Sequence, residues 1–264
     1  MKCKDIIRII EELAPPKLAK DWDNVGLLVG DKEKDIKTIM IALDPTQDVI
    51  KQGIDGDVDM LITHHPLIYS PMKRITYDNF IGRRIIDLIR SDMAYYAMHT
   101  NFDATAMAEE AAERLKLSNL KILELEEQDM EFGIGRIGDL EETMTLEQCA
   151  LFVKEKFHTE YVRIVGEKQK EVSRVAISPG AGKSLIKPAL MNKVDVLIAG
   201  DIDHHSAIDA AEQGLCIIDA GHFGTEHIMT QYMNQYLSDY IASHFTGETV
   251  KILSAYEKSP FSIC

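Results

Sequence analysis

Hydrophobic and polar positions alternate along the chain in a way that predicts strands and helices in turn. Between Asp5 and Leu13, isoleucines and a leucine recur at helical spacing, and two prolines then end the predicted helix. An apolar run over Thr38–Leu43 predicts a strand, a helix is expected from Gln47, and a second strand from Val58. This order is typical of a βαβ unit in an α/β protein.

The second half of the chain repeats this order. Its predicted elements are strand Arg174–Ile177, helix Ser184–Leu190, strand Val194–Ile198, helix Ser206–Gln213, strand Leu215–Ile218, helix Glu226–His244 and strand Val250–Leu253. We therefore predict an α/β fold with two similar lobes, over about 1–123 and about 146–264. The acidic, glycine-containing segment 124–145 is expected to cross from one lobe to the other.

Two stretches match almost letter for letter. VDMLITHHP begins at Val58 and runs into His64 and His65, whereas VDVLIAGD begins at Val194 and ends in Asp201. The match predicts that the halves share an ancestor.

Each half then continues with a strand-like run, a histidine and, four residues later, an acid. These pairs are His99 with Asp103 and His222 with Glu226. Neutral imidazoles and carboxylates are the ligands that zinc, manganese and iron take in hydrolytic sites. Because loops after strands build the sites of α/β proteins, the pattern favours one composite metal site between two lobes.

The number of ions depends on the adjacent pair His64 and His65. Neighbouring side chains of an extended segment point to opposite faces, so both bind one ion only if the strand has ended in a turn. Alternatively, each binds a different ion. Two ions about 3.5 to 4 Å apart match the arrangement of two-metal hydrolases, and we favour this dinuclear interpretation. The metal is zinc, manganese or iron.

Composition excludes several classes of function. No apolar run approaches the roughly 20 residues that cross a bilayer, and the charged N-terminus does not resemble a signal peptide, so we expect a cytoplasmic protein without a membrane partner. The net charge of -14 disfavours nucleic acid as a partner. A small-molecule substrate, including a nucleotide, stays open because cations neutralise phosphates locally. The cysteines, expected to be reduced, are Cys3, Cys149, Cys216 and Cys264.

Two glycine-rich stretches imitate nucleotide-binding motifs. Gly133, Gly135 and Gly138 satisfy G-x-G-x-x-G, but acidic residues rather than a helix follow them, so we interpret them as turns. The stretch 178–184 lacks the first glycine of a P-loop. It is either a tight turn or an anion site at a helix start with Lys183 as counter-charge.

Other polar residues have two interpretations each. Asp44 either faces the site or caps the helix that follows, which is the commoner use of aspartate there. His204 and His205 either begin a helix or contact substrate. Trp22 and Asn24 are expected to pack or turn the chain near the site.

Five motifs occur in the order of a known family. They are DWDNVGLLVG (21–30), LITHHP (61–66), HTNFD (99–103), GIGRIG (133–138) and GHFGTE (221–226). With them the whole chain resembles the Nif-three-like family, often labelled GTP cyclohydrolase 1 type 2 homologues.

The resemblance implies a three-layer α/β/α fold of two intertwined lobes with mixed sheets, a dinuclear metal centre and a toroidal homohexamer. The metal ligands that it implies are His64, His65, Asp103, His222 and Glu226. It leaves His99 beside the metals, although the internal repeat makes His99 the counterpart of His222. We assign His99 to proton transfer or to support of the ligands.

The label implies that water attacks C8 of guanine, opens the imidazole ring and releases formate, or that a related nucleotide or phosphoester is hydrolysed. Metal ions lower the pKa of water to about 7, and an imidazole such as His99 can move the proton. The alternative is a non-catalytic metal chaperone or regulatory protein. Five protein ligands for two ions leave positions for water, which favours the enzyme.

Overall fold

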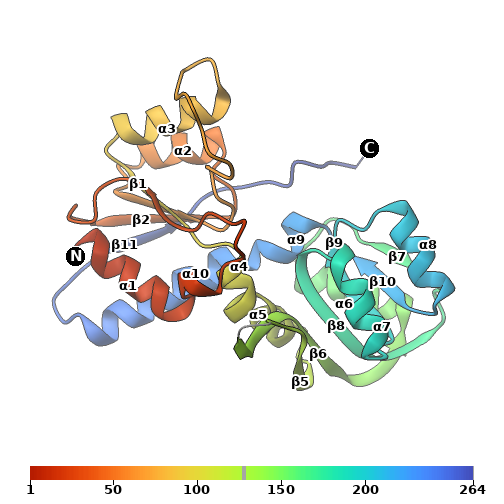
Figure 1. Cartoon of the computed structure of the whole chain (residues 1–264). Helices are drawn as coiled ribbons and strands as arrows, with labels where there is room; N and C mark the ends of the chain where they lie inside the picture. The colour runs from red at the N-terminus through yellow and green to blue at the C-terminus, as the bar shows by residue number, and fades with distance from the viewer. Residues whose placement is uncertain (127–128, 264) are drawn as a thin grey trace. The chain divides into compact units, whose positions relative to one another are not determined.

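The computed structural model describes residues 1–126 and 129–263, and the chain forms two compact units. Unit 1 comprises Met1–Phe102 and Met229–Cys264, and unit 2 comprises Asp103–Ile228 (Figure 1). The chain therefore passes from unit 1 into unit 2 after Phe102 and returns after Ile228. Unit 2 is one uninterrupted stretch, whereas unit 1 is built from both ends of the chain.

Unit 1 contains a five-stranded sheet with the order β1-β4-β3-β2-β11. Its strands are β1 Gly26–Val29, β2 Thr38–Ala42, β3 Met60–Thr63, β4 Ala94–Ala97 and β11 Lys251–Ser254. Strands β2, β3, β4 and β11 are parallel, and β1 joins the edge antiparallel to β4. Because the parallel strands share one direction, the segments that follow β2, β3 and β4 leave the sheet at the same edge.

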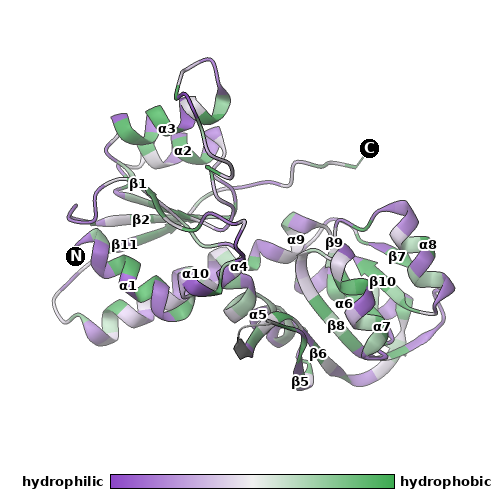
Figure 2. Ribbon diagram, in the orientation of Figure 1, coloured by the Kyte–Doolittle hydropathy of each residue, from purple (hydrophilic) through white to green (hydrophobic). Residues whose placement is uncertain are grey.

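Helices cover both faces of this sheet. They are α1 Cys3–Leu13, α2 Gln47–Asp55, α3 Phe80–Arg90, α4 Thr100–Phe102 and α10 Ile228–His244, with a 3₁₀ turn at Pro16–Leu18. Ile50 of α2 and Leu88 of α3 share a core with Leu61 of β3, while α1 and α10 lie on the opposite side (Figure 1). The mixed hydrophobic and hydrophilic residues of α1 are visible in Figure 2. Unit 1 thus has three layers.

Unit 2 contains a six-stranded mixed sheet with the order β5-β6-β8-β9-β10-β7, in which only β8, β9 and β10 run parallel. Its strands are β5 Ser118–Glu126, β6 Asp129–Thr145, β7 Arg163–Val165, β8 Glu171–Ala181, β9 Val196–Gly200 and β10 Cys216–Asp219. Its helices are α5 Ala108–Arg114, α6 Leu146–Lys156, α7 Ile186–Met191, α8 His204–Glu212 and α9 His222–Glu226, with a π-helical turn at Asp103–Met107 and a 3₁₀ turn at Lys183–Leu185.

The central strand of unit 2 is covered on both faces. Leu197 and Ala199 of β9 belong to the core that contains Ala189 of α7 and Ala210 of α8. All five residues of β9 are buried, including those that alternate with this pair. A strand that is apolar at every position requires this two-sided cover.

The same backbone contacts recur in both units. A carboxylate oxygen of Asp59 accepts hydrogen bonds from the amides of Lys37 and Thr38, and the equivalent oxygen of Asp195 accepts from Ser173 and Arg174. The backbone oxygens of the two aspartates accept from the first residues of β4 and β10. The aspartate of the repeated VD dipeptide therefore makes the same hydrogen bonds in both units, as a duplication predicts.

Most predicted elements are confirmed, and the predicted α/β class with mixed sheets is confirmed with them. The helix expected from Glu226 begins instead at His222, and α9 and α10 follow each other. The segment expected to cross between lobes, 124–145, lies mostly in β5 and β6 of unit 2, apart from residues 127 and 128, which are outside the described part. The GIGRIG glycines are not turns, because all of them lie within β6.

Glycine is required in β6 by close neighbours. A β-carbon at Gly133 would lie 2.3 Å from the backbone oxygen of Glu124, and one at Gly138 would lie 2.7 Å from the side chain of Leu117. Gly135 also has a φ of +71°, which L side chains rarely adopt. These glycines therefore permit close strand packing.

The hydroxyl of Tyr95 organises the loop that carries two predicted metal ligands. It accepts a hydrogen bond from the amide of Leu67 at 2.8 Å and lies 3.0 Å from the backbone oxygen of His65 and 2.8 Å from Oγ1 of Thr63. Burial raises the pKa of this phenol, so the group stays neutral. Tyr95, a residue of β4, thus holds the loop after β3 in place through hydrogen bonds.

Tyr95→Phe is expected to lower the free energy of unfolding by about 1–3 kcal/mol, because the buried amide of Leu67 loses its acceptor. The neighbouring Tyr96→Phe is the matched control. Its phenol is buried too, but its one hydrogen bond within the described part of the chain is a long one to Glu11 at 3.5 Å, so we expect less than about 1 kcal/mol. Urea titrations followed by circular dichroism measure both, and equal losses would contradict the assigned role of Tyr95.

Candidate metal centre

Three histidines of unit 1 gather where its parallel strands end. His64 and His65 directly follow β3, and His99 follows β4. One nitrogen of each lies within 4.8 Å of the others. Since β3 has ended at Thr63, the chain is no longer extended there, and the adjacent imidazoles are free of the alternation that a strand imposes.

Hydrogen bonds fix the tautomers of His64 and His65. Nδ1 of His64 lies 3.0 Å from the backbone oxygen of Met98, which only accepts, so Nδ1 carries the proton. Nδ1 of His65 lies 2.8 Å from a carboxylate oxygen of Asp44. In both rings Nε2 is left as the nitrogen with a lone pair, and metal-binding histidines are oriented in this way by a carbonyl or carboxylate partner.

Asp44 supports His65 and does not cap a helix. The N-cap of α2 is Thr46, whose side chain accepts from the amide of Val49. Two carboxylate oxygens of Glu257 accept from the amides of Leu43 and Asp44 at 2.7 and 3.0 Å. Burial raises the pKa of Glu257, while these amides lower it. The capping interpretation of Asp44 is therefore wrong, and the interpretation that it faces the site is favoured.

His99 has a carboxylate partner of its own. Its Nδ1 lies 3.0 Å from Oδ1 of Asp23, and Oδ2 of Asp23 accepts from the amide and hydroxyl of Thr100 at 3.0 and 2.6 Å. Burial opposes ionisation of Asp23, but the hydrogen bonds from His99 and Thr100 outweigh it and hold its pKa well below the usual range. An ionised Asp23 keeps the proton of His99 on Nδ1 and leaves Nε2 to accept another.

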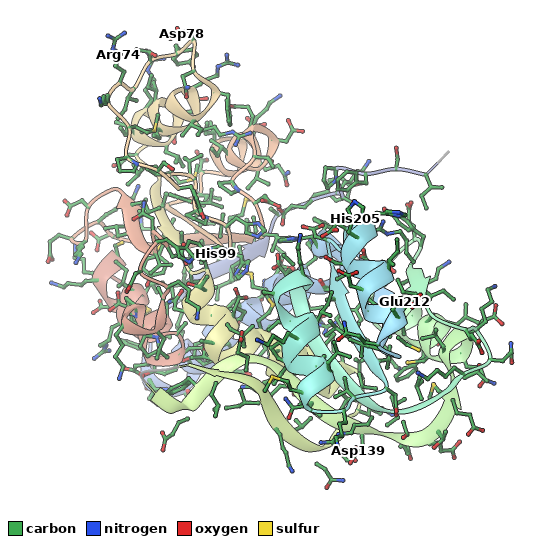
Figure 3. All side chains as sticks on the ribbon, turned by 45° about the vertical axis from the view of Figure 1, so that its right-hand side comes forward. Arg74, Asp78, His99, Asp139, His205 and Glu212 are labelled. Carbon is green, nitrogen blue, oxygen red and sulfur yellow. The ribbon has the colours of Figure 1, made fainter. Side chains whose placement is uncertain are left out.

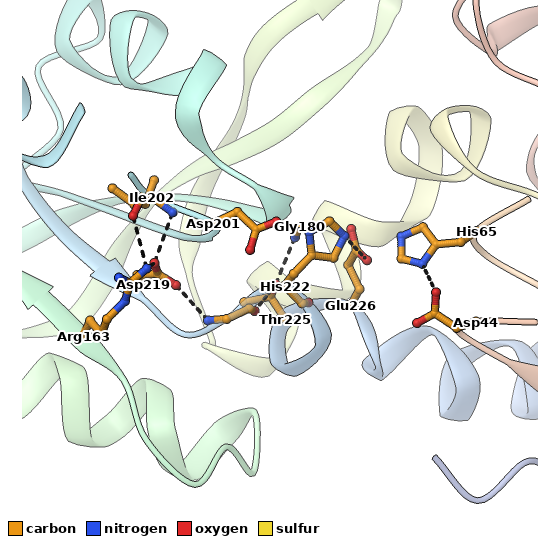
Figure 4. Close-up of polar contacts among 11 residues, drawn as sticks. Asp44, His65, Arg163, Gly180, Asp201, Ile202, Asp219, His222, Thr225 and Glu226 are labelled. Atoms are coloured by element: carbon orange, nitrogen blue, oxygen red, sulfur yellow. Dashed lines mark hydrogen bonds and ion pairs between the residues drawn. The ribbon is translucent and has the colours of Figure 1, made fainter. Parts of the chain in front are cut away.

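Unit 2 carries the acidic candidates (Figure 4). Nδ1 of His222 lies 2.8 Å from Asp201, and its Nε2 lies 3.0 Å from Oε2 of Glu226, one helical turn later. An oxygen of Glu226 and one of Asp103 lie within 4.8 Å of each other. Asp103 begins a π-helical turn, and such turns are frequent at functional sites.

Backbone contacts position α9 within unit 2 (Figure 4). The amide of Gly180 donates to Oγ1 of Thr225 at 2.9 Å, and this hydroxyl donates to the oxygen of Gly221. The buried carboxylate of Asp219 accepts from the amides of Gly221 and Ile202. The loop after β8, the loop after β9 and the start of α9 are therefore held together around His222.

Asp201 has the same role in unit 2 as Asp44 in unit 1, since each carboxylate holds Nδ1 of a candidate ligand. The backbone of Asp201 has a φ of 55°, a left-handed conformation that aspartate tolerates better than most residues. Strained backbone of this kind persists where the surrounding structure holds it, and functional sites are common places for it.

The second histidine pair lies on the surface of unit 2. Asp203 caps α8 by accepting from the amides of His205 and Ser206, so the helix begins at His204 and not at Ser206. Both imidazoles are exposed, and His205 lies at the start of α8 with Glu212 at its end (Figure 3). The polar helix entry is thus the better interpretation of the pair.

Lys183 is engaged by a carboxylate. Its Nζ lies 2.9 Å from Asp203, and together with Ser206 it holds the pKa of that carboxyl well below the usual range. β8 extends through the predicted glycine turn to Ala181, and the helix that follows has only six residues. An anion site with Lys183 as counter-charge is therefore not supported.

The described cysteines are buried and form no disulfide bonds. Burial raises the pKa of Cys149 to about 12 and that of Cys3 to about 11, which makes their thiols poor metal ligands and poor nucleophiles. Cys216 is also free, and Cys264 lies outside the described residues. These thiols are structural.

Sequence reasoning missed Asp23, Glu257 and Tyr95. The first lies in the polar DWDN stretch, whose two aspartates beside the single tryptophan were a usable signal. The other two act on partners far away in sequence, and no local pattern marks them.

Comparison with known proteins places the chain in a family. The model of Duf34/NIF3 (NGG1p interacting factor 3) matches residues 1–259. The chain belongs to the Duf34/NIF3 family. A relative from Clostridium acetobutylicum named GTP cyclohydrolase 1 type 2 homolog is 38% identical over 229 residues, which cover 86% of this chain and 85% of the relative. A relative of the same name from Methanocaldococcus jannaschii is 36% identical, with 86% and 90% covered.

Solved structures of other proteins share the fold. A Bacillus cereus protein related to NIF3 has a TM-score of 0.93 at 25% identity, with 100% of this chain and 99% of that chain covered. Reduced HcgD from Methanocaldococcus jannaschii has a TM-score of 0.81 at 35% identity, with 96% and 97% covered. Within the described part of the chain, no helix is long and apolar enough to cross a membrane.

The residues fit a divalent cation. Unit 1 offers imidazoles whose Nε2 atoms are left unprotonated by their partners, and unit 2 offers an imidazole and two carboxylates within short reach of one another. Nitrogen and carboxylate donors of this kind suit zinc, manganese and iron.

Proposed function

We propose that the two groups of ligands together bind a pair of divalent cations, and that the protein is a metal-dependent hydrolase acting on a small nucleotide. The proposed ligands are His64, His65, Asp103, His222 and Glu226. The observation that carries the proposal is the fixed tautomer of His64 and His65. In each ring Nδ1 donates its proton to a hydrogen bond, and the lone pair that can bind a metal ion is on Nε2. A histidine used only for packing needs no such arrangement.

The path of the chain supports a shared site. Asp103 is the first residue of unit 2 after the chain leaves unit 1, only four residues beyond His99. Glu226 stands two residues before the end of unit 2, where the chain returns. Both crossings therefore keep ligands of unit 2 close along the chain to unit 1.

The chemistry divides between the cations and the protein. Bound divalent cations supply a nucleophile near neutral pH, because they lower the pKa of water to about 7 in favourable sites. Asp44 and Asp201 hold the imidazoles in the orientation that donates Nε2. Nε2 of His99 accepts a proton and passes it to the leaving nitrogen, while Asp23 stabilises the resulting imidazolium.

The reaction that we propose follows the name of the relatives. Water adds across the bond between C8 and N7 of the guanine ring, which places a hydroxyl on C8 and a proton on N7. The bond from C8 to N9 then breaks, N9 takes the hydroxyl proton, and C8 remains on N7 as a formamide. A second water adds at C8, the bond from C8 to N7 breaks with proton transfer to N7, and C8 leaves as formate. Both steps are hydrolyses, so no oxidant or reductant is needed. A related nucleotide or phosphoester hydrolysis uses the same groups.

Formate release from GTP tests this function. With added zinc, manganese or iron, the protein is expected to release formate, and His65→Ala and Asp103→Ala are expected to abolish the release. His205→Ala, an exposed histidine of unit 2, is the control and is expected to keep full activity. Circular dichroism verifies that each variant is folded.

Absence of turnover from GTP and from a panel of nucleotides and phosphoesters, in a protein saturated with metal, would contradict the hydrolase. Retained metal binding in that case would favour the chaperone or regulatory function. The toroidal homohexamer and the cytoplasmic location stay predictions.

A further inference from the structure

Two aromatic side chains of unit 1 are unusually exposed for their size. Trp22 is 55% exposed and Tyr69 is 56% exposed, and their ring centroids lie 5.9 Å apart. Exposed aromatic rings that touch each other mark a binding surface more often than single exposed apolar residues do.

The loop that carries Trp22 is held at two points, so its exposure is not due to a loose segment. Asp23 accepts hydrogen bonds from Thr100 and lies against His99, and the side-chain amide of Asn24 donates to the backbone oxygen of Ile68 at 2.5 Å. Ile68 is the residue before Tyr69. The two loops that present the rings are therefore tied to each other and to the loop after β4.

The aromatic pair adjoins the candidate metal centre. The rings of Trp22 and His99 lie 6.0 Å apart at 70°, and His99 lies 5.1 Å from His64 and 5.5 Å from His65. A ring resting on Trp22 would thus lie one side chain away from the histidine cluster.

We propose that Trp22 and Tyr69 form a stacking surface for a planar nitrogen heterocycle of the purine class, which they hold against the histidines of unit 1. This inference rests on the proposed function and names the residues that hold the base of its substrate. Because the two rings already touch at 5.9 Å, the ligand lies on the exposed face of the pair and not between them. Stacking requires only a π-face, so the pair recognises the ring while other groups fix its orientation.

The net charge of -14 favours a single small nucleoside or nucleotide over a nucleic-acid strand. Long polyanions are repelled over their whole length, whereas one base brings little charge to the surface.

Trp22 is the single tryptophan of the chain, so its fluorescence reports this surface alone. Metal-free protein in EDTA is titrated with guanosine and with GMP, and both are expected to quench the emission. Tyr69→Ala is expected to weaken guanosine binding by about tenfold or more. The matched control is Tyr256→Ala, a tyrosine of unit 1 that is 70% exposed and is expected to change nothing.

Equilibrium dialysis with labelled guanosine covers the variants without the fluorophore. Trp22→Phe is expected to retain binding within a few-fold, and Trp22→Ala to lose about tenfold or more. Equal affinity of Trp22→Ala and Trp22→Phe, or no quenching by either ligand at millimolar concentration, would overturn the proposal. So would resistance of the free protein to acrylamide quenching, because another copy of the chain would then cover Trp22.

Binding in EDTA is independent of turnover, which separates this inference from the proposed function. Guanosine binding that depends on Trp22, without formate release, would retain the stacking surface and remove the hydrolase. Formate release with an unchanged KM in Trp22→Ala would do the reverse. Binding of an oligonucleotide far tighter than that of guanosine would reject the small ligand.

Discussion

A chain with both His64→Ala and His65→Ala is expected to lose affinity for divalent cations by more than about 100-fold. Removing only a supporting partner of a metal-binding histidine typically costs about 10- to 100-fold, and these two residues are proposed to bind the cations directly. Elemental analysis after dialysis against zinc measures the metal content, and isothermal titration calorimetry measures the affinity.

The control for this variant is a second pair of adjacent histidines. His204→Ala with His205→Ala makes the same change in composition at an exposed position of α8 and is expected to leave the metal content unchanged. Equal metal loss in both double variants would mean that the ions bind histidines without selection, which the proposed centre does not allow.

Gly180→Ala is expected to disturb the site through a single methyl group. A β-carbon at Gly180 would lie 2.1 Å from Oε1 of Glu226, and the residue has a φ of +75°. The carboxylate must therefore move, or the loop after β8 must shift with its hydrogen bond to Thr225. We expect metal affinity to fall by about 10- to 100-fold, the range seen when a ligand is displaced from its supported position.

Gly214→Ala separates this steric effect from backbone strain. Gly214 has a φ of +82°, but a β-carbon there meets nothing within 4 Å. Both variants are expected to lose about 1–2 kcal/mol of stability from the left-handed backbone, whereas only Gly180→Ala is expected to lose metal. Unfolding by urea and calorimetry with zinc measure the two effects, and unchanged zinc affinity in Gly180→Ala would argue against Glu226 as a ligand.

The parts of the fold that could be predicted from sequence are those that follow local periodicity. Apolar runs such as VDMLI and VDVLI occur in strands that are buried on both faces, and their composition marks them directly. The glycines of β6 were misjudged because their cause is the close approach of β5 and the side chain of Leu117, which only the folded sheet creates. The start of α9 at His222 follows the contact of Thr225 with the distant Gly180 and the hydrogen bond from the amide of Gly221 to Asp219.

The candidate ligands could be found because each follows a strand in a repeated motif. The residues that support His99 and Asp44 could not be found in this way. Asp23 lies 76 residues from His99, and Glu257 lies 213 residues from Asp44. At such separations no motif with a fixed spacing marks the two residues as partners. Asp44 was visible, but aspartate after a strand is used more often as a cap, and only Thr46 in the N-cap of α2 excludes that use.

Along the sequence, unit 2 is inserted between the two segments of unit 1, and this order has a consequence for synthesis on the ribosome. Unit 2 is complete once Ile228 has emerged, whereas unit 1 still needs α10 and β11, which are made after unit 2. Because β11 pairs with β2, the backbone amides and carbonyls on that edge of β2 stay unpaired until translation has passed Ser254. Unit 2 can therefore fold before unit 1. Nascent chains that stall before Ser254 are expected to expose an unpaired strand edge that can pair with another chain, and to need a chaperone.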